Sequence, residues 1–214
     1  EWLPSGRWKP NAKLRSGRFL RGLPLEETTL AEALRKAGYV TCIAGKWHLG
    51  SEPFSTPGHH GFDVNIGANE HGNPGNYFYP YKGQWSIPTT RLRARWQVLP
   101  GGKPGEYLTE RLTEESIKFI EERDGKKPFL LYLSYYNIHT PIQPYKKRID
   151  HYKEKAAETF EGNTPLRPEH EGKTRMRQDN AALASMVAAV DDSVGALLGK
   201  LDDLKITDDT VVIF

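Results

Sequence analysis

Residues 29–50 read TLAEALRKAGYVTCIAGKWHLG, and this stretch contains the segments that decide the fold. Thr29 and Glu32 have the spacing of a capping box, apolar residues recur at positions 30, 33, 34 and 37, and Gly38 follows, which together predict a short helix. The next residues, YVTCIA at 39–44, are apolar and β-branched and predict a buried strand. A helix that leads directly into such a strand is typical of an α/β fold.

The same order recurs twice further along the chain. EYLTERLTEESIKFIEERDG at 106–125 predicts a helix that buries Leu108, Leu112, Phe119 and Ile120, and PFLLYLSYY at 128–136 predicts a second strand. NAALASMVAAVDDSVGALLGKLDDL at 180–204 predicts a long helix with an apolar stripe at 183, 187, 190, 194, 197, 201 and 204. TVVIF at 210–214 predicts a third strand. We therefore expect an α/β fold with a mostly parallel sheet sandwiched by helices.

Two longer stretches lack such periodicity. Residues 51–105 are rich in glycine, proline and aromatic residues, which predicts a long ordered loop region. Residues 143–173 are charged and contain proline, and we expect a connection that is helical in part. A chain of 214 residues suits one sizeable unit, so we expect a single domain over 1–214.

Composition and charge argue against a few classes of partner and site. The chain has 30 basic and 27 acidic residues, and its net charge of +3 is too small to predict a nucleic-acid partner, although the first 21 residues hold most of the surplus. We find no run that approaches the roughly 18 apolar residues of a membrane span and no signal-peptide pattern. Cys42 is the single cysteine, which excludes an intrachain disulfide and a cysteine-based zinc cluster. We expect it to be a buried, inert thiol.

Polar side chains follow the first two predicted strands, where open α/β sheets bind ligands. In an extended segment Lys46 and His48 would point to one side and Trp47 to the other, so that a cation and a proton carrier address one ligand. His139, in NIHTP at 137–141, would reach the same place if the two strands are neighbours. The residues alone leave open whether these are an anion site or an ordinary surface lysine and loop histidine.

Four segments together resemble the middle of a type I sulfatase of the alkaline phosphatase superfamily. They are AGYVTCIAGKWHLG at 37–50, GHHGFD at 58–63, PFLLYLSYYNIHTP at 128–141 and VDDSVGALLGKLDDLKITDDTVVIF at 190–214. The resemblance extends from about Leu23 to Phe214. It implies an alkaline phosphatase/sulfatase-like fold that is incomplete in this chain, with residues 1–214 forming the central part of a sulfatase catalytic domain.

The resemblance also implies roles for individual residues. Lys46 matches the lysine that binds a sulfate oxygen, and His48 matches the histidine that hydrogen-bonds the formylglycine hydrate and accepts its proton when sulfate is expelled. His139 matches the histidine that contacts sulfate and protonates the leaving oxygen. His71 lies in NEHGNPGNYFYPY at 69–81, where amides and tyrosines suit a sugar, so we expect it to bind substrate. Packing of these aromatic side chains within the loop is the alternative.

Other parts of the family pattern are missing from the chain. The family's C/S-x-P-x-R element provides the formylglycine, but Cys42 is followed by IAGK and cannot be that nucleophile. The segments that hold calcium in the family are also missing, and Asp191 and Asp192 sit within a predicted helix as a structural or solvated pair and not as the metal site. Zinc at His59 and His60 is disfavoured because adjacent residues point apart and no third ligand accompanies them. We thus expect no metal ligand in this chain, while calcium and formylglycine are implied for the parent protein.

The function implied by the resemblance is hydrolysis of a sulfate ester of a small molecule or carbohydrate by the full-length parent, with this fragment alone inactive. Two alternatives remain open. One is a phosphoesterase or phosphonate hydrolase of the same superfamily, and the other is a catalytically silent sulfatase-like binding module. The family also suggests export to the periplasm, the lysosome or the exterior, whereas the oligomeric state and the individual ester are left unspecified.

Overall fold

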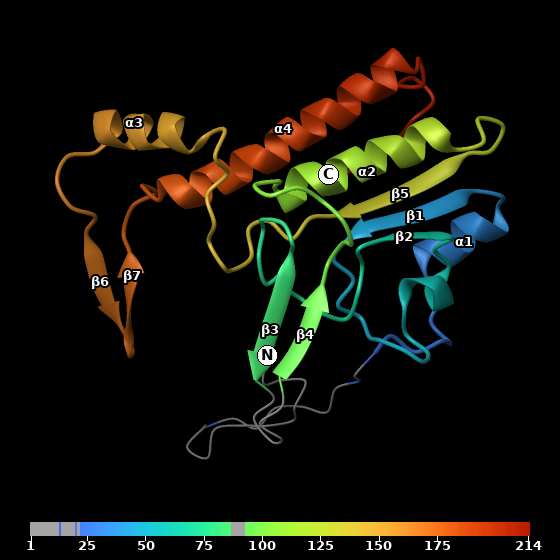
Figure 1. Cartoon of the computed structure of the whole chain (residues 1–214), viewed down its shortest axis with the longest axis horizontal. Coiled ribbons are helices and arrows are strands. Elements are labelled where there is room, and N and C mark those ends of the chain that lie inside the picture. Colours follow the sequence, from blue (N-terminus) through green and yellow to red (C-terminus); the bar gives the residue numbers. More distant parts are fainter. Residues whose placement is uncertain (1–12, 14–19, 21, 87–92) are drawn as a thin grey trace. The chain divides into compact units, whose positions relative to one another are not determined.

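The computed structural model describes residues 13, 20, 22–86 and 93–214 (Figure 1). Most of the basic N-terminal stretch therefore lies outside the described residues. Contacts between Cα atoms divide the chain into two compact units. The first contains residues 1–72 and 119–134, and the second contains residues 73–118 and 135–214.

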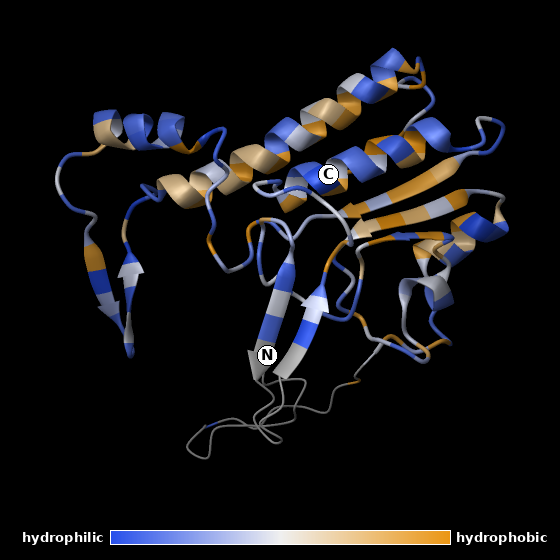
Figure 2. Ribbon diagram, viewed as in Figure 1, coloured by the Kyte–Doolittle hydropathy of each residue, from blue (hydrophilic) through white to orange (hydrophobic). Residues whose placement is uncertain are grey.

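A parallel sheet forms the centre of the first unit. Its strand order is β2-β1-β5, with β2 at Val64–Ile66, β1 at Val40–Gly45 and β5 at Phe129–Ser134. Cys42 of β1 lies opposite Val64 on one side and Leu131 on the other. The strands β1 and β5 are largely apolar in Figure 2, as is typical of parallel strands. The first two predicted strands and their parallel pairing are thus confirmed.

Helix α1, Leu30–Lys36, begins at the predicted capping box. The Thr29 hydroxyl accepts a hydrogen bond from Glu32 N at 3.1 Å, and the Glu32 carboxylate accepts one from Thr29 N at 2.8 Å. The predicted apolar stripe is wrong, because Leu30 is 62% exposed and Ala31 is the buried residue. The Thr29 hydroxyl also donates to the His60 carbonyl, which helps fix the rotation of this short helix.

Ala31 belongs to the main apolar cluster of the first unit. Its other buried members are Ile43, Trp47, Phe62 and Ala68. The Trp47 and Phe62 rings meet edge to face with centroids 6.2 Å apart. Because Ile43 belongs to β1 and Trp47 follows it, this cluster packs against the segment that comes after the strand.

The second unit is built around α2, Leu108–Glu122, whose last residues belong to the first unit, and α4, Ala181–Asp203. Leu108, Leu112 and Ile120 of α2 are at most 2% exposed, as predicted. The predicted stripe of α4 is only partly correct, since Leu201 is buried but Val187 is 52% exposed, and most of the buried side chains are small ones outside the stripe. The buried residues of α4 are Ser185, Met186, Ala188, Ala189, Ser193 and Leu201.

Polar contacts, as well as the size of the side chains, determine which face of α4 is buried. Ser185 Oγ accepts a hydrogen bond from Tyr145 N at 3.0 Å, and the Met186 carbonyl accepts one from Asn137 Nδ2 at 2.7 Å. Small side chains let those backbone and amide groups approach the helix closely. Hydropathy alone therefore did not identify the small residues that α4 buries most completely.

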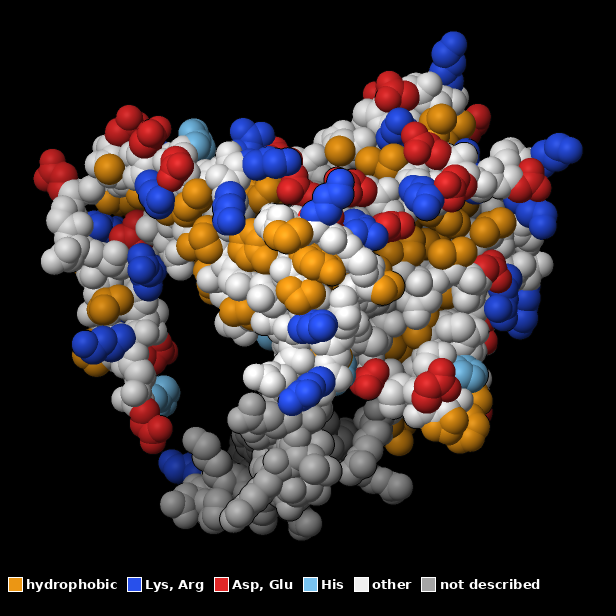
Figure 3. Space-filling view, in the orientation of Figure 1, with side chains coloured by type: hydrophobic (Ala, Val, Ile, Leu, Met, Phe, Trp, Pro, Cys, Tyr) orange, Lys and Arg blue, Asp and Glu red, His pale blue; other side chains and the backbone are white. Residues whose placement is uncertain are grey.

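Helix α3, Ile149–Thr159, packs against α4 and confirms the expected helical part of the 143–173 connection. The guanidinium of Arg148, which precedes α3, forms two hydrogen bonds to the Asp192 carboxylate at 2.9 and 2.6 Å. This ion pair gives Asp192 the structural role predicted for it, while Asp191 is exposed. Acidic and basic side chains are interspersed over the face of α2 and α4 seen in Figure 3.

By length and composition, α4 is apolar enough to cross a membrane, although no such run was expected from the sequence. Only 28% of its most apolar window is buried within the molecule. A core helix of a globular protein meets the same criteria, so this finding alone assigns no membrane role.

Several short elements were not predicted from the sequence. The supposed loop at 51–105 contains β2, the short 3₁₀ helix η1 at Pro57–His60, and an antiparallel hairpin of β3, Lys82–Ser86, and β4, Arg93–Gln97. A second hairpin is formed by β6 at Leu166–Glu169 and β7 at Gly172–Arg175, so it begins in the 143–173 connection and ends just beyond it. Both hairpins are polar and short, so they lack the apolar signal of core strands.

The third predicted strand, TVVIF, is not a strand in the structure. Val211 is 86% exposed and Phe214 is fully exposed. A strand is stabilised by pairing with a neighbour, and these residues pair with no strand in the described part of the chain. The apolar composition of TVVIF is therefore not sufficient to form a strand, because a strand also needs a neighbouring strand with which to pair.

Candidate functional site

The residues after β1 turn sharply instead of continuing as a strand. Gly45 has a φ of 99° and His48 a φ of 57°, both in the left-handed region. The extended geometry expected for Lys46 and His48 is therefore wrong, although Trp47 is buried as predicted and is 8% exposed. The Lys46 amide donates to the Ser134 carbonyl at 2.7 Å, which keeps the start of this turn on the end of β5.

Lys46 lines a cavity of about 400 Å³ within the first unit. The other lining residues are mainly apolar: Leu23, Leu30, Ala31, Trp47, Leu49, Phe62, Leu130 and Tyr132, with Thr29 and Ser134. No ion pair joins the Lys46 ammonium to any residue that the structure describes. A cation beside apolar walls attracts an anion more strongly than it does in bulk water.

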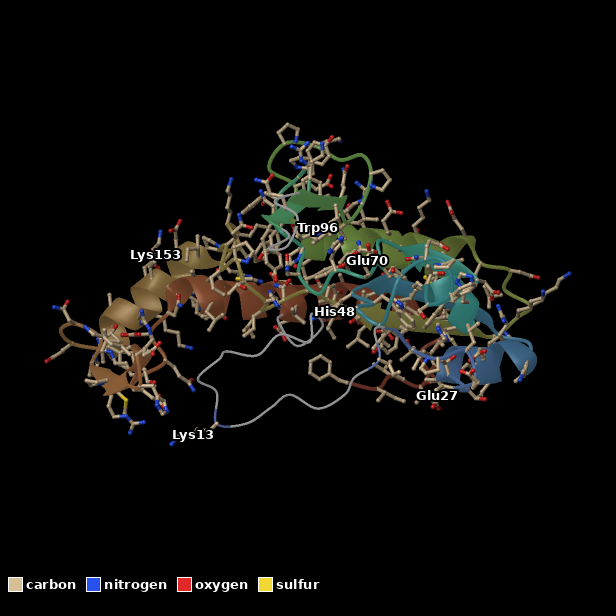
Figure 4. All side chains as sticks on the ribbon, turned by 90° about the horizontal axis from the view of Figure 1, so that it is seen from below. Lys13, Glu27, His48, Glu70, Trp96 and Lys153 are labelled. Carbon is tan, nitrogen blue, oxygen red and sulfur yellow. The ribbon has the colours of Figure 1, made fainter. Side chains whose placement is uncertain are left out.

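The His48 residue is exposed, and its backbone is hydrogen-bonded to the loop that follows β2. Its backbone amide donates to the Asn69 carbonyl at 3.0 Å. Gly72 lies against the imidazole so closely that a Cβ at this position would be 2.2 Å from His48 Cε1. His48 and Glu70 are both labelled in Figure 4, on the segments that follow β1 and β2. The close approach at Gly72 restricts where the His48 ring can lie.

His71 is anchored by the same asparagine as His48. The Asn69 side chain accepts a hydrogen bond from the His71 amide at 2.8 Å, and His71 Nε2 lies 3.6 Å from the Glu70 carboxylate. Asn65 shapes the preceding turn, because its amide group exchanges hydrogen bonds with the backbone of Ala68 at 2.9 and 3.0 Å. Neither asparagine was predicted to have this role, although an asparagine whose side chain hydrogen-bonds the backbone two or three residues later is a known turn signal.

His139 belongs to the second unit and is exposed. Its Nδ1 lies 2.7 Å from the Thr140 carbonyl oxygen, which can only accept, so Nδ1 holds the hydrogen in this contact. Nε2 is then the nitrogen that is left to contact a ligand. Lys46, His48 and His71 thus belong to the first unit, where His48 and His71 share Asn69 as a backbone anchor and Lys46 lines a cavity that neither histidine lines, while His139 belongs to the second unit.

The described residues do not supply a metal site or the expected nucleophile. They contain no group of three or more His, Cys, Asp or Glu side chains that could hold a metal ion. Cys42 is fully buried in the middle of β1, and burial raises the pKa of its thiol to about 12. His60 is buried against Trp47 with ring centroids 5.6 Å apart, while His59 contacts the Thr56 hydroxyl. Calcium and formylglycine therefore do not fit these residues.

A family model described as Sulfatase matches residues 7–214. The chain belongs to the sulfatase family. This confirms the resemblance on which the site residues were chosen, and it agrees with the parallel sheet and its flanking helices.

Known relatives extend this result. The sulfatase chain is 32% identical to human N-acetylgalactosamine-6-sulfatase over 99% of its own length, and 36% identical to Rattus norvegicus arylsulfatase G over 56%. It spans 37% and 27% of these two relatives, respectively.

Solved structures support the same fold. The structure of Ps i-CgsB in complex with k-i-k-neocarrahexaose gives a TM-score of 0.58 at 24% identity and covers 85% of this chain and 38% of that one. BT4656 in complex with D-glucosamine-2-N,6-O-disulfate gives 0.55 at 19% identity and covers 88% of this chain and 49% of that one. At these identities the likeness shows an alkaline phosphatase/sulfatase-like fold and nothing finer.

Proposed function

We propose that the full-length parent of this chain is a sulfuric ester hydrolase that removes sulfate from a carbohydrate, and that residues 1–214 form the central part of its catalytic domain. The observation that carries the proposal is Lys46, a cation without an ionic partner among the described residues, which directly follows β1 and lines an apolar cavity together with residues of α1 and β5. Family membership and sulfated sugars in the names of several relatives and solved complexes support the same substrate class.

Hydrolysis breaks the bond between sulfur and the leaving oxygen, and that oxygen must gain a proton. We assign sulfate binding to Lys46, whose positive charge would offset the charge that develops on the sulfate oxygens. We assign protonation of the leaving oxygen to His139, since its Nδ1 hydrogen is engaged by Thr140 and Nε2 can present the second proton. His48 would accept a proton during sulfate release, and His71 would contact the sugar.

Calcium and formylglycine are implied by the family and would belong to other parts of the parent. Formylglycine would supply the nucleophilic hydroxyl, and calcium would stabilise negative charge near it. Because the described residues do not fit either group, the roles assigned to Lys46, His48, His71 and His139 concern only the side chains of this chain.

The same family membership suggests an exported or lysosomal protein, and we propose that location for the parent. The proposed partner is a sulfated carbohydrate, in keeping with the sugar sulfates named for similar proteins. His71, whose side chain is 20% exposed and whose Nε2 lies 3.6 Å from the Glu70 carboxylate, is the residue that we assign to this contact.

Release of inorganic sulfate by the full-length parent tests the proposal. The panel should contain a nitrophenyl sulfate, sulfated hexosamines and the matching phosphate esters. We expect turnover of at least one sulfate ester, and Lys46→Ala should lower kcat/KM by about 100-fold or more. Lys126→Ala is the matched control, because it removes the same charge from an exposed position on the same unit.

Three results would contradict the proposal. Preferred turnover of the phosphate esters would favour a phosphoesterase, and binding of sulfated sugars without turnover would favour a silent binding module. Full activity of Lys46→Ala would remove the role assigned to that residue.

A further inference from the structure

The loop that contains His139 is fixed by a buried tyrosine from a distant segment. Tyr77 is fully buried, and its hydroxyl lies 2.7 Å from the Tyr136 carbonyl oxygen and 3.0 Å from the His139 carbonyl oxygen. All three residues belong to the second unit. One hydroxyl thus sits between two backbone carbonyls that flank the turn at residues 136–139.

The Tyr77 ring and backbone are themselves held in place. The ring stacks on Tyr107 with centroids 5.7 Å apart, and the Tyr77 amide donates to Gln143 Oε1 at 2.7 Å. Burial raises the pKa of the Tyr77 phenol, so the hydroxyl keeps its hydrogen near neutral pH. It therefore acts as a constant donor to the His139 loop.

The side chain of Asn137 provides a second anchor for the same loop. Asn137 accepts a hydrogen bond from the Thr109 hydroxyl of α2 and donates to the Met186 carbonyl of α4. The loop is consequently attached to two helices and to Tyr77, while the His139 side chain remains exposed. Such an arrangement fixes the backbone of an exposed acid–base group without occupying its ring.

We infer that Tyr77 is a positioning residue for His139, with Thr109 supporting the same loop through Asn137. This inference rests on the proposed function, because Tyr77 would act through the proton that His139 is proposed to give to the leaving oxygen. A proton donor matters most for a poorly acidic leaving alcohol such as a sugar hydroxyl, and least for a nitrophenol. Loss of the Tyr77 hydroxyl should therefore affect these two substrates differently.

The test uses Tyr77→Phe in the full-length parent, with Tyr145→Phe as the matched control. Tyr145 is 3% exposed, its ring also contacts Tyr107, and its hydroxyl bonds the Glu110 carboxylate instead of the His139 loop. We expect Tyr77→Phe to lower kcat for a sugar sulfate about tenfold, with less than a twofold change for nitrophenyl sulfate and little change in KM. Tyr145→Phe should change both substrates equally and slightly.

A double-mutant cycle separates positioning from general destabilisation. In a His139→Ala background, Tyr77→Phe should lower kcat by less than about twofold, because its effect passes through His139. If Tyr77→Phe does not fold, Thr109→Val is the second variant, and it should give the same selective loss while Thr109→Ser restores activity. Additive losses in the cycle, or equal losses on both substrates, would overturn the inference.

Different results would contradict the catalytic role of His139 and the positioning role of Tyr77. If the wild-type parent releases no sulfate, or if His139→Ala is fully active on the sugar sulfate, the proposed function of His139 fails and the positioning role fails with it. If His139→Ala is impaired but Tyr77→Phe behaves like Tyr145→Phe, only the positioning role of Tyr77 is wrong.

Discussion

Replacing Gly72 with alanine should damage catalysis far more than stability. A Cβ at Gly72 would lie 2.2 Å from His48 Cε1 and 2.3 Å from Nδ1. Comfortable contacts between carbon atoms are at about 3.5 Å, so the imidazole would have to move by roughly 1.3 Å. Because His48 is exposed, it can move toward solvent, and the free energy of unfolding should fall by less than about 1 kcal/mol.

The catalytic cost follows from the displacement. A misplacement of about 1 Å in a reacting group can lower the rate by roughly 100-fold, and we expect that loss in kcat/KM for sulfate release by the full-length parent. Gly58→Ala is the control, since the nearest atom to its added Cβ would be Thr56 Oγ1 at 4.0 Å. This control should retain wild-type activity and thermal stability.

The assay combines initial rates with thermal unfolding of the same preparations. In a His48→Ala background, Gly72→Ala should have little further effect on the rate, because the group that it displaces is already gone. The reasoning would be refuted by an active Gly72→Ala variant, by a loss of rate matched by a large drop in Tm, or by a full additional loss in the double variant.

Two further predictions concern stability. Hydrogen bonds from Arg148 hold the pKa of Asp192 below its ordinary value of 3.8, so this group stabilises the fold above that pH and loses its contribution as pH falls through the lower folded value. Asp192→Asn should therefore lower Tm at pH 7, but it should have no effect at a pH below the lowered pKa of Asp192. A difference in Tm that does not change with pH, or an equal effect of Asp191→Asn, would contradict the role of the ion pair. Thr29→Ala should destabilise the fold by about 1 kcal/mol in urea titrations, because it removes the hydroxyl that caps α1, whereas Thr29→Ser should be close to wild type. Equal losses in both Thr29 variants would count against the capping role.

Local patterns predicted the fold where the stabilising contacts are themselves local or repetitive. The capping box at Thr29 depends on residues three apart, and β1 and β5 are continuous apolar runs, so both were visible in the sequence. Turns and polar hairpins were missed because their side chains bond nearby backbone and leave no periodic apolar signal. TVVIF was overpredicted because strand formation also requires a neighbouring strand.

The candidate site residues could be chosen from the sequence, but the contacts that hold them could not. Lys46, His48 and His139 were chosen because they follow apolar strands, and their roles stay predictions. The hydroxyl of Tyr77 contacts the His139 loop 62 residues away in sequence, and no spacing rule encodes such a contact. The role of Asn69 likewise depends on how the segment after β2 folds back on His48.

The single thiol of this chain has a practical consequence. Cys42 sits in β1 with paired strands on both sides, and its high pKa leaves almost no thiolate at neutral pH. Alkylating reagents should therefore modify it only when the sheet itself opens. The rate of that labelling would measure how often the centre of the first unit comes apart, without any introduced probe.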